Sequence, residues 1–553
     1  GGKARGLGFI NTLLTNYALS YKFDKVDIYV PAAIVLATDV FDSFMEENDL
    51  FSFAINEQDD EEIISRFLEA ERFPSDVVLK LIEFLSIVQV PLAVRSSSLL
   101  EDSQFQPFAG IYNTYMIPNK DEDLDVRLDE LIQTIKLVFA STFLKRAKNY
   151  LKVTSYRLEE EKMAVIIQKI VGTQHEERFY PEISGVAKSY NFYPISPQES
   201  DDGIVSVALG LGKTVVEGGN TVRFCPKYPK HLMQFFSTTD TMKNAQQNFY
   251  ALDDFDTLFH GDSPIPKDLT TCYDLTVAEK DGTLRYLGST YSAENDAVYD
   301  GISREGNRIV TFAPILKHNI FPLPSIIKTL FDYGTWGMGT QVEIEFAVNF
   351  SVPKGDLIEF AMLQMRPMVM TREAAHIEFK NIEQKDILCT SEQVLGDGIL
   401  DNIYDVILVD KNKFDRSKSK DVAIEISKLN EKLIEKNKQY ILIGVGRWGS
   451  LDHWLGIPVT WEQISGAAVI VESSFSDFSV SPSQGSHFFH NITSFRIGYF
   501  TIEDNKKSSF VDWEWLSKQK TEEELEFTKH IKFKKPLITK ISGQKNKGVI
   551  QKP

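Results

Sequence analysis

The segment that most constrains this chain is PLAVRSSSLLEDSQFQPFAGIYNTY, residues 91–115. It opens with an apolar run that predicts a buried strand, and Arg95 stands at the end of that strand, followed by the serines 96–98. A guanidinium presents a planar fork of donors that matches two phosphate oxygens, and neighbouring hydroxyls and backbone N–H groups can complete an anion-binding hollow. The pattern therefore predicts a phosphate site. Ser98 to Glu101 also reads as a capping box, and a helix start alone would explain that serine.

A second candidate site lies in the strands VEIEFAV and IEFAMLQMRP, which the turn PKGD joins as a hairpin. The period of two places Glu343 and Glu345 on one face of the first strand, and Gln364 and Arg366 on one face of the second. Mg2+ prefers oxygen ligands and binds through one or two carboxylates plus substrate phosphates, which Arg366 could hold directly. The alternative is a stabilising cross-strand pair of glutamate and arginine on an exposed face.

The N-terminal sequence GGKARGLG precedes an apolar run at residues 9–14 with helical spacing. Glycines before a helix would let the backbone approach an anion, and Lys3 would add a point charge for a polyphosphate. Helical patterns also appear at residues 61–71, 75–88, 123–150 and 325–333, with a glycine-marked loop after the last, and a buried strand is expected at 163–171.

Composition narrows the class of protein. With 553 residues, the chain is long enough for two to four domains. The net charge of −18 argues against a nucleic-acid-binding protein, and the lysines from Lys529 onward are expected to lie on a solvated strand edge. Three scattered cysteines, without CxxC spacing, indicate a reducing compartment without disulfides or zinc.

No apolar run reaches the ~18 residues of a membrane span, and no signal peptide is visible. We therefore expect a cytoplasmic protein without a membrane partner, and a homodimer is compatible with the sequence. The chain begins with Gly1 inside a motif, so we expect it to be a fragment of a longer protein.

The motifs VRSSS, ED, FAG and TY of residues 94–115 occur in the order found in one family of enzymes. They resemble VRSSA, ED, SFAG and ETY in the nucleotide-binding domain of the pyruvate phosphate dikinase and phosphoenolpyruvate synthase family. The opening GGK is similar to that family's GGKGANL, and the hairpin is similar to its DIEWA and LQxRP signatures. The resemblance covers residues 1–371, with gaps, and implies an ATP-grasp fold in which two α+β lobes close over ATP.

This resemblance, together with the patterns above, implies an ATP and Mg2+ site. The strand at residues 163–171 is similar to the family's hinge beside adenine, which makes Gln168 and the backbone of Ile170 candidate base contacts. The residues expected at the nucleotide are Lys3, Arg95, Ser96, Gly110, Thr114, Gln168, Ile170, Glu343 and Arg366, and those expected at the metal are Glu345 and Gln364.

The chain departs from the family at two positions near the expected nucleotide. Ile111 stands where the family has a glutamine after FAG, so any polar contact of that side chain is lost. In the segment GLGKTVV, Lys213 replaces a glutamate and reverses a charge. These departures put the usual contacts there in doubt.

A polar stretch at residues 372–385 reads as a linker, and a separate unit follows at 386–553. This unit contains a sequence match to the dinucleotide-binding fingerprint. GVGRWG follows a predicted strand, and Glu472 follows a second apolar run. The context does not fit, because Gly456 and Pro458 interrupt the residues where a helix should receive the pyrophosphate. We therefore reject dinucleotide binding.

The same unit has a weaker resemblance to the family's swivelling phosphohistidine domain. Residues 458–472 are similar to its helix-then-strand segment, Gly485-Ser486-His487 to its Thr-Ser/Cys-His, and the ending at 541–550 to its VDG and GxV. The resemblance implies that His487 carries a phosphoryl group, since a neutral imidazole is nucleophilic near pH 7. Phe488 and Phe489 replace the family's small residues, and both His490 as the reactive group and a purely structural His487 remain open.

The expected architecture is α+β, with a two-lobed ATP-grasp domain at residues 1–371 and a smaller α/β swivelling domain at 386–553. Arg95 and His487 are the expected catalytic residues of an ATP-dependent, dikinase-like phosphotransferase. The phosphoryl acceptor is unknown, because too few residues follow for a phosphoenolpyruvate-binding barrel of ~250 residues. The alternative is a regulatory protein that binds ATP without transferring phosphate.

Overall fold

The structure is a computed structural model that describes residues 1–98, 100–101, 110–152, 156–253, 258, 266–368, 377, 379, 382–450, 452, 454–474, 486–495, 497–503, 508–543 and 545–553. The chain divides into two compact units. Unit 1 comprises residues 1–191, 195–215 and 220–368, and unit 2 comprises 192–194, 216–219 and 369–553. Among the described residues, no helix is both long enough and apolar enough to cross a bilayer.

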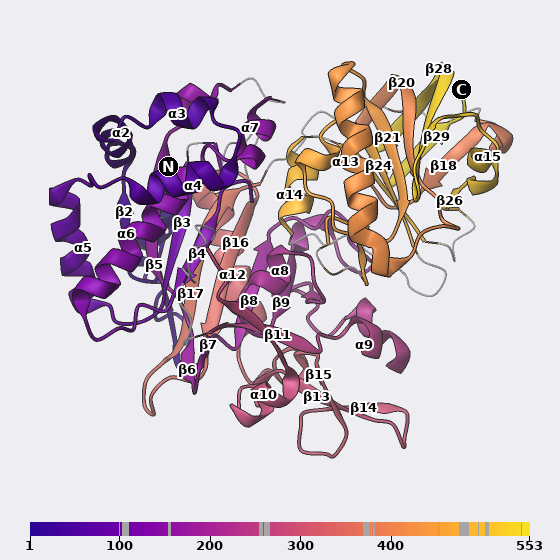
Figure 1. The fold of residues 1–553 in the computed structure, drawn as a ribbon. Helices are drawn as coiled ribbons and strands as arrows, with labels where there is room; N and C mark the ends of the chain where they lie inside the picture. The colour runs from indigo at the N-terminus through magenta and orange to yellow at the C-terminus, as the bar shows by residue number, and fades with distance from the viewer. Residues whose placement is uncertain are drawn as a thin grey trace. The chain divides into compact units, whose positions relative to one another are not determined.

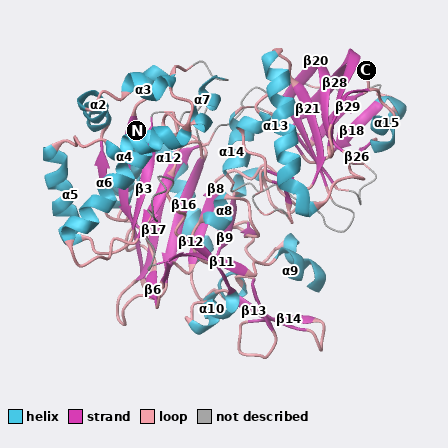
Figure 2. Ribbon diagram, viewed as in Figure 1, coloured by secondary structure: helices cyan, strands magenta, loops and turns pink. Residues whose placement is uncertain are grey.

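Unit 1 begins with an antiparallel four-stranded sheet, in the order β2-β5-β3-β4, beside which most of the N-terminal helices gather (Figure 2). Burial is nearly complete along β5, as its unbroken apolar run predicts. The strands are β2 (Ala33–Leu36), β3 (Leu92–Ser98), β4 (Thr114–Ile117) and β5 (Met163–Lys169). The helices are α1 (Gly2–Asn16), α2 (Thr38–Glu47), α3 (Phe51–Asn56), α4 (Asp60–Glu69), α5 (Ser75–Ile87), α6 (Leu124–Ser141) and α7 (Lys145–Lys152).

A second, six-stranded sheet has the order β1-β17-β16-β8-β9-β10 and contains the predicted hairpin, β16 and β17. Its neighbours are antiparallel except for β1 and β17, which run parallel. Two sheets in one unit are compatible with a two-lobed domain. The strands are β1 (Val26–Tyr29), β8 (Ile183–Lys188), β9 (Ile204–Ala208), β10 (Val222–Phe224), β16 (Val342–Asn349) and β17 (Ile358–Pro367).

Two smaller sheets, β12-β11-β7-β6 and β14-β13-β15, complete unit 1. Their strands are β6 (Thr173–His175), β7 (Arg178–Tyr180), β11 (Asn248–Asp253), β12 (Thr270–Asp274), β13 (Gly288–Ser292), β14 (Ala297–Asp300) and β15 (Asn307–Val310). The accompanying helices are α8 (Lys213–Val216), α9 (Thr238–Asn244), α10 (Leu275–Lys280), α11 (Ala313–Leu316) and α12 (Leu323–Met338).

Unit 2, orange to yellow in Figure 1, is built on a large mixed sheet in the order β19-β25-β24-β21-β20-β28-β29-β18-β26, with β27 paired to β28. The strands β20, β21, β24 and β25 run parallel to one another, and α13 packs against the sheet. The strands are β18 (Ile387–Ser391), β19 (Val394–Leu395), β20 (Asp397–Val409), β21 (Tyr440–Val445), β24 (Ala467–Ser473), β25 (Gly498–Ile502), β26 (Phe510–Val511), β27 (Thr521–Glu524), β28 (Thr528–Ser542) and β29 (Lys547–Gln551). The helices are α13 (Ser419–Glu435), α14 (His487–Ser494) and α15 (Trp513–Ser517).

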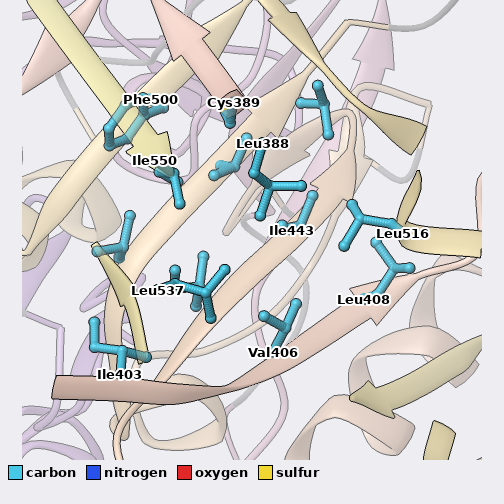
Figure 3. Packing of buried hydrophobic residues seen from close by; sticks show 14 of the residues in the cluster. Leu388, Cys389, Ile403, Val406, Leu408, Ile443, Phe500, Leu516, Leu537 and Ile550 are labelled. Atoms are coloured by element: carbon cyan, nitrogen blue, oxygen red, sulfur yellow. The ribbon is translucent and has the colours of Figure 1, made fainter. Parts of the chain in front are cut away.

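The core of unit 2 consists of apolar side chains contributed by distant parts of its sequence (Figure 3). Leu388, Ile443, Phe500 and Ile550 come from β18, β21, β25 and β29, and each is fully or almost fully buried. Burial of this apolar surface is the main force that holds the sheet together. The predicted α+β class is thus confirmed.

Several expected elements differ from the structure. The glycines of the N-terminal motif do not precede a helix, because α1 already begins at Gly2. The helix expected over residues 123–150 is interrupted between α6 and α7, so its basic residues lie in a second, short helix. The helix α12 extends through Gly334 and Gly337, and only Gly339, with φ +67°, ends it.

The lysine-rich C-terminal segment is also not a sheet edge. Its long strand β28 lies inside the sheet, with β20 on one side and β29 on the other. Lys532, Lys534 and Lys535 are nonetheless exposed. Lys534 and Lys535 fall between Lys532 and Leu537, where the register of β20 and β28 shifts and no pairing to β29 is formed, so this part of β28 can present lysines to solvent.

Candidate nucleotide site

The centre of the predicted site is one guanidinium that joins two distant strands. Arg95, on β3, directs Nη2 to Oε2 of Glu345 at 3.2 Å and to Oε1 of Gln364 at 3.1 Å. Glu345 and Gln364 are direct partners in the register of β16 and β17, so both side chains leave the same face of the hairpin. Folding therefore brings together three predicted residues that are widely separated in the sequence.

A β-bulge adjoins this pair. The register passes from Glu345 opposite Gln364 to Phe346 opposite Met362, which leaves Leu363 as the extra residue on β17. Bulges bend and twist a strand locally, and they are over-represented next to functional sites, where they re-aim side chains. The site thus lies where the regular ladder of the hairpin is interrupted.

The C-terminal part of β3, which extends past Arg95 to Ser98, is linked to α1 through Lys3. Its Nζ lies 2.6 Å from Oε1 of Glu101 and 3.1 Å from the carbonyl oxygen of Ser96. Glu101 also accepts hydrogen bonds from the hydroxyl of Ser96 at 2.8 Å and from the backbone N–H of Ser98 at 2.9 Å. The last contact is one half of the predicted capping box. Glu101 therefore positions Lys3, and the Ser96 hydroxyl donates to this carboxylate.

The hairpin carries a buried ion-pair cluster two residues from Glu345. Glu343 accepts a hydrogen bond from Nε of Arg366 at 2.9 Å, across the strand pair, and Nζ of Lys188 on β8 lies 2.9 Å away. All three side chains are buried, and burial lowers the pKa of Lys188 despite the adjacent carboxylate. Two cations and one carboxylate give these three residues a net charge of +1. That surplus suits a site for phosphate.

The predicted cross-strand pair and the predicted phosphate contact are therefore the same residues. Arg366 does pair with Glu343, but on a buried face instead of the exposed face that the alternative assumed. Lys188 was not predicted. The sequence signal was a lysine at the end of the buried strand ISGVAK, since a lysine is seldom fully buried unless it is paired.

The candidate base contacts lie on and after β5. Gln168 is 1% exposed, and no described residue accepts a hydrogen bond from its amide nitrogen. The backbone N–H of Ile170 donates to the carbonyl oxygen of Pro91 at 2.9 Å, which leaves the carbonyl of Ile170 as the group that a base could meet. A buried amide without a partner is costly unless a ligand satisfies it, so Gln168 fits a nucleotide base.

The two remaining candidates for nucleotide contacts are Gly110, which precedes β4, and Thr114, the first residue of β4. Thr114 is exposed and lies opposite Arg95 in the register of β3 and β4. Gly110 adopts φ +71°, a conformation that favours glycine. Asp102 and the Phe108-Ala109 part of the predicted motif lie outside the described residues.

Among the described residues, no group of three acidic, histidine or cysteine side chains is arranged to hold a metal by itself. Mg2+ that binds with a nucleotide needs only one or two oxygen ligands from the protein, because the phosphates supply others. Glu345 and Gln364 offer such a pair of oxygens, with Arg95 now between them. The donor set therefore fits a metal that arrives with its nucleotide.

Comparison with known proteins identifies the family of the chain. The model of the family described as "Pyruvate phosphate dikinase, AMP/ATP-binding domain" matches residues 1–386. The chain belongs to this family.

Named relatives of this dikinase domain include three phosphotransfer enzymes. The chain is 30% identical over 200 residues to the uncharacterized phosphotransferase YvkC of Bacillus subtilis, a match that covers 36% of this chain and 21% of the relative. It is 26% identical to the phosphoenolpyruvate synthase of Aeropyrum pernix over 39% of this chain and 25% of that enzyme. It is 29% identical to the rifampicin phosphotransferase of Bacillus cereus, in a match that covers 28% of this chain and 16% of that enzyme. The chain thus matches a quarter or less of each relative.

The two departures from the dikinase pattern have local structural partners. Lys213 forms an ion pair with Asp268, donates to the hydroxyl of Thr270 at 3.0 Å and lies 4.9 Å from the ring centre of Tyr250. Ile111 is buried. The reversed charge is therefore compensated within unit 1, and the lost polar group is replaced by an apolar contact.

His487, the predicted phosphoryl carrier, belongs to unit 2 and is the first residue of α14. Ser486 is the N-cap, and its hydroxyl accepts the backbone N–H of Phe489 at 3.2 Å. Gly485, the first residue of the predicted motif, lies outside the described residues. The expected helix at the start of the 458–472 segment is only a short 3-10 turn at Glu462–Ile464.

The dinucleotide pattern is rejected by the structure as well. The strand β21 is followed by the short strand β22 (Arg447–Trp448), which pairs with β23 (Gly456–Ile457), where a dinucleotide site would have a helix. Glu472 accepts hydrogen bonds from the backbone N–H of Trp448 at 3.2 Å and from the hydroxyl of Tyr499. It is therefore engaged within the protein instead of facing a ribose.

Proposed function

We propose that unit 1 binds ATP with Mg2+, and that the protein moves a phosphoryl group from ATP to a histidine carrier and on to an acceptor that is still unknown. The observation that supports this most directly is the contact of Arg95 with Glu345 and Gln364. These residues match two separate motifs of the dikinase family, and a common nucleotide site would explain why they converge. ATP and Mg2+ are accordingly the proposed cofactors.

In this proposal, each residue acts mainly through position and charge. Arg95 and Arg366 would hold phosphate oxygens, Lys3 would add a point charge, and Gln168 would bind the base. Bound Mg2+ would be held by Glu345 and Gln364 and would neutralise charge on the phosphates. In phosphoryl transfer, positioning and charge neutralisation account for most of the catalysis, because little covalent chemistry is left to the protein.

The proposed carrier is His487. A neutral imidazole nitrogen attacks the phosphorus, the N–P bond forms and the bond from phosphorus to the leaving phosphate oxygen breaks. The phosphorylated side chain would lie at the N-terminus of α14, where backbone N–H groups and the helix dipole favour negative charge. The proposed carrier belongs to unit 2 and the proposed nucleotide residues belong to unit 1, which is the division expected of a swivelling domain that serves a nucleotide domain.

The test is to incubate the protein with ATP labelled at either the β- or the γ-phosphate and to measure protein-bound label. We expect label that is stable to base and labile to acid, as for a phosphohistidine, and we expect its loss in His487→Ala and in Arg95→Ala. The variant His490→Ala separates the two neighbouring histidines, and His318→Ala, at an exposed histidine of unit 1, is the matched control. Acid-stable label, or label that survives His487→Ala, would reject the carrier.

A second candidate function is a regulatory protein that binds ATP without transferring phosphate. The observations that favour it are the structural engagement of Lys213 and the packing of Phe488 against Gly449, where a carrier loop of the family would have small residues. Calorimetry decides between the two. Tight ATP binding without formation of ADP or AMP would support the regulatory function.

A further inference from the structure

Unit 2 contains a buried arginine whose charge is not matched by an ion pair. Arg447, at the start of β22, is 8% exposed, and its Nη1 donates to the carbonyl oxygen of Gly218 at 2.7 Å. Its Nε is buried and has no hydrogen-bond partner among the described residues. Within the part of the chain that the structure describes, no carboxylate lies within ion-pair distance of this guanidinium.

Such an arrangement is costly unless something else satisfies it. Removing a charged group from water costs several kcal/mol, even after relaxation, and one carbonyl oxygen satisfies one of the five N–H donors of a guanidinium. Gly446 and Gly449, with φ +80° and +70°, bracket Arg447 in a tight backbone turn, so its position is fixed by the chain. An oxyanion would supply the missing charge and acceptors.

Arg447 also lies where ligands bind in sheets of this kind. The parallel strands β21, β24 and β25 end close to it, and the backbone N–H of Gly446 donates to the carbonyl oxygen of Ser473 at 2.8 Å. In open α/β sheets, ligands bind beyond the carboxyl ends of the parallel strands. A second group of this kind lies at the same ends: Thr501 is 1% exposed, and its hydroxyl has no hydrogen-bond partner in the part of the chain that the structure describes.

Glu472 is the charged side chain that lies next to Arg447 and Thr501. Glu472 lies opposite Thr501 in the register of β24 and β25, and it interacts electrostatically with Arg447. Its carboxylate, however, accepts from Trp448 and Tyr499. Both of these hydrogen bonds go to Oε2 of Glu472, so the carboxylate is held within unit 2 by its neighbours.

The helix α14 approaches the same turn. A Cβ atom added at Gly449 would come within 2.2 Å of Cγ of Phe488, so the beginning of α14 packs directly against the turn that carries Arg447. The first turn of a helix presents backbone N–H groups and favours anions. An incompletely satisfied guanidinium and the beginning of a helix thus belong to segments of unit 2 that pack together through Gly449 and Phe488.

We propose that Arg447, Thr501 and the beginning of α14 form an oxyanion-binding site, the Arg447 site. If the proposed function holds, this site binds the acidic group of the phosphoryl acceptor beside the proposed carrier helix. The family model ends at residue 386, so it does not cover these residues. Binding of the oxyanion itself does not depend on the transfer reaction.

The test uses the full-length chain in an Arg95→Ala background, which weakens phosphate binding in unit 1. Acetate and inorganic phosphate are titrated separately by calorimetry, and thermal unfolding is recorded with each. We expect at least one probe to bind and to raise the unfolding midpoint. Arg447→Met should weaken that binding about tenfold or more, because it removes charge-assisted hydrogen bonds while nearly preserving volume. The probe that binds identifies the oxyanion as a carboxylate or a phosphate.

Two further variants keep the result interpretable. Thr501→Val removes only a hydroxyl and should weaken binding without lowering the midpoint of the ligand-free chain, and it decides the matter if Arg447→Met fails to fold. Lys420→Met removes an exposed positive charge of α13 and should change nothing. Absence of binding by both probes, or binding unaffected by Arg447→Met and Thr501→Val, would overturn the proposal.

The two proposals fail separately. Absence of acid-labile label in the unaltered chain, or label that survives His487→Ala, together with intact acetate or phosphate binding, would reject the phosphoryl carrier and leave the Arg447 site in place. Intact labelling of His487, combined with no oxyanion binding, would reject the Arg447 site alone.

Discussion

Arg95 holds the position between the two proposed metal ligands, and this predicts a coupling between metal and nucleotide. Nη2 contacts both Glu345 and Gln364, so a cation that uses these oxygens must displace the guanidinium. We expect Mg2+ to bind weakly by itself and tightly with ATP, whose phosphates would attract Arg95 away. Arg95→Ala should therefore strengthen binding of Mg2+ alone and weaken ATP binding about tenfold or more.

Calorimetric titrations with Mg2+, with ATP and with both measure these affinities. Arg304→Ala, at an exposed arginine of unit 1, is the control and should alter none of them. If Arg95→Ala weakens binding of Mg2+ alone, the guanidinium does not compete with the metal, and the geometry has been misinterpreted.

Glu161 predicts a pH dependence of stability. It is buried, accepts a hydrogen bond from Tyr112 at 2.9 Å, and burial raises its pKa from 4.5 to about 7. The folded chain therefore binds more protons than the unfolded chain between those pH values, so stability falls as the pH rises from about 4.5 to about 7. Glu161→Gln should remove this contribution and stabilise the chain at pH 8, by up to about 3 kcal/mol.

Chemical denaturation of both proteins at pH 5 and pH 8 checks this. Glu159→Gln, two residues away and exposed, provides the matched control. The same loss of stability in wild type and Glu161→Gln between pH 5 and pH 8 would show that another group is responsible.

At the residue scale, the sequence predicted which candidate side chains lie together better than it predicted the partners that hold them. Arg95, Glu345 and Gln364 converge as expected, because motif letters and strand periodicity both place them. The contacts that support them depend on tertiary structure. Lys188 pairs with Glu343 from a strand that is distant in the sequence, and no local sequence pattern indicates such a pairing. Whether the converging residues bind ATP remains a prediction.

The strand β16 offers a comparison between two glutamates that differ in burial and role. Glu343 is 3% exposed and balances two buried cations, whereas Glu345 is partly exposed. Glu343→Gln should destabilise the chain by about 3–5 kcal/mol, because it leaves Lys188 and Arg366 without their carboxylate. Glu345→Gln should change stability little and weaken Mg2+-ATP binding.

Thermal unfolding and ATP titration of the two variants separate these effects on one element. The expected result is a loss of stability in one variant and a loss of metal-dependent affinity in the other. Equal destabilisation by both would mean that Glu345 is a structural residue of the hairpin.

At the element scale, hydrophobic periodicity predicted whether a segment is a helix or a strand, but it did not predict where helices are interrupted or continue. The hairpin and β5 follow from alternating and continuous apolar runs. The break between α6 and α7 has no proline or glycine to signal it, and α12 continues through two glycines that suggested a loop. Contacts explain the second case: Gly334 packs against Met365 and Gly337 against Phe9, so tertiary packing compensates for their low helix propensity.

At the scale of the whole molecule, the expected linear division differs from the way the structure groups its residues. The sequence places a linker at residues 372–385, yet unit 2 also includes residues 192–194 and 216–219. Phe192 and Tyr193 pack with ring centres 5.8 and 6.2 Å from that of Phe489. Composition marks a polar linker, but it cannot reveal short segments that leave one unit and pack in the other.

These inserted segments predict that the C-terminal region is incomplete by itself. A fragment of residues 386–553 lacks the aromatic partners of Phe489 and the carbonyl group of Gly218 that accepts from Arg447. We expect α14 in the fragment to be less stable by about 1–3 kcal/mol than in the full chain, from lost aromatic packing and a lost hydrogen bond to a buried charge. Hydrogen exchange of the α14 amides measures this locally. Phe192→Ala in the full chain should reproduce part of the loss, whereas equal protection of α14 in fragment and full chain would show that residues 386–553 fold independently.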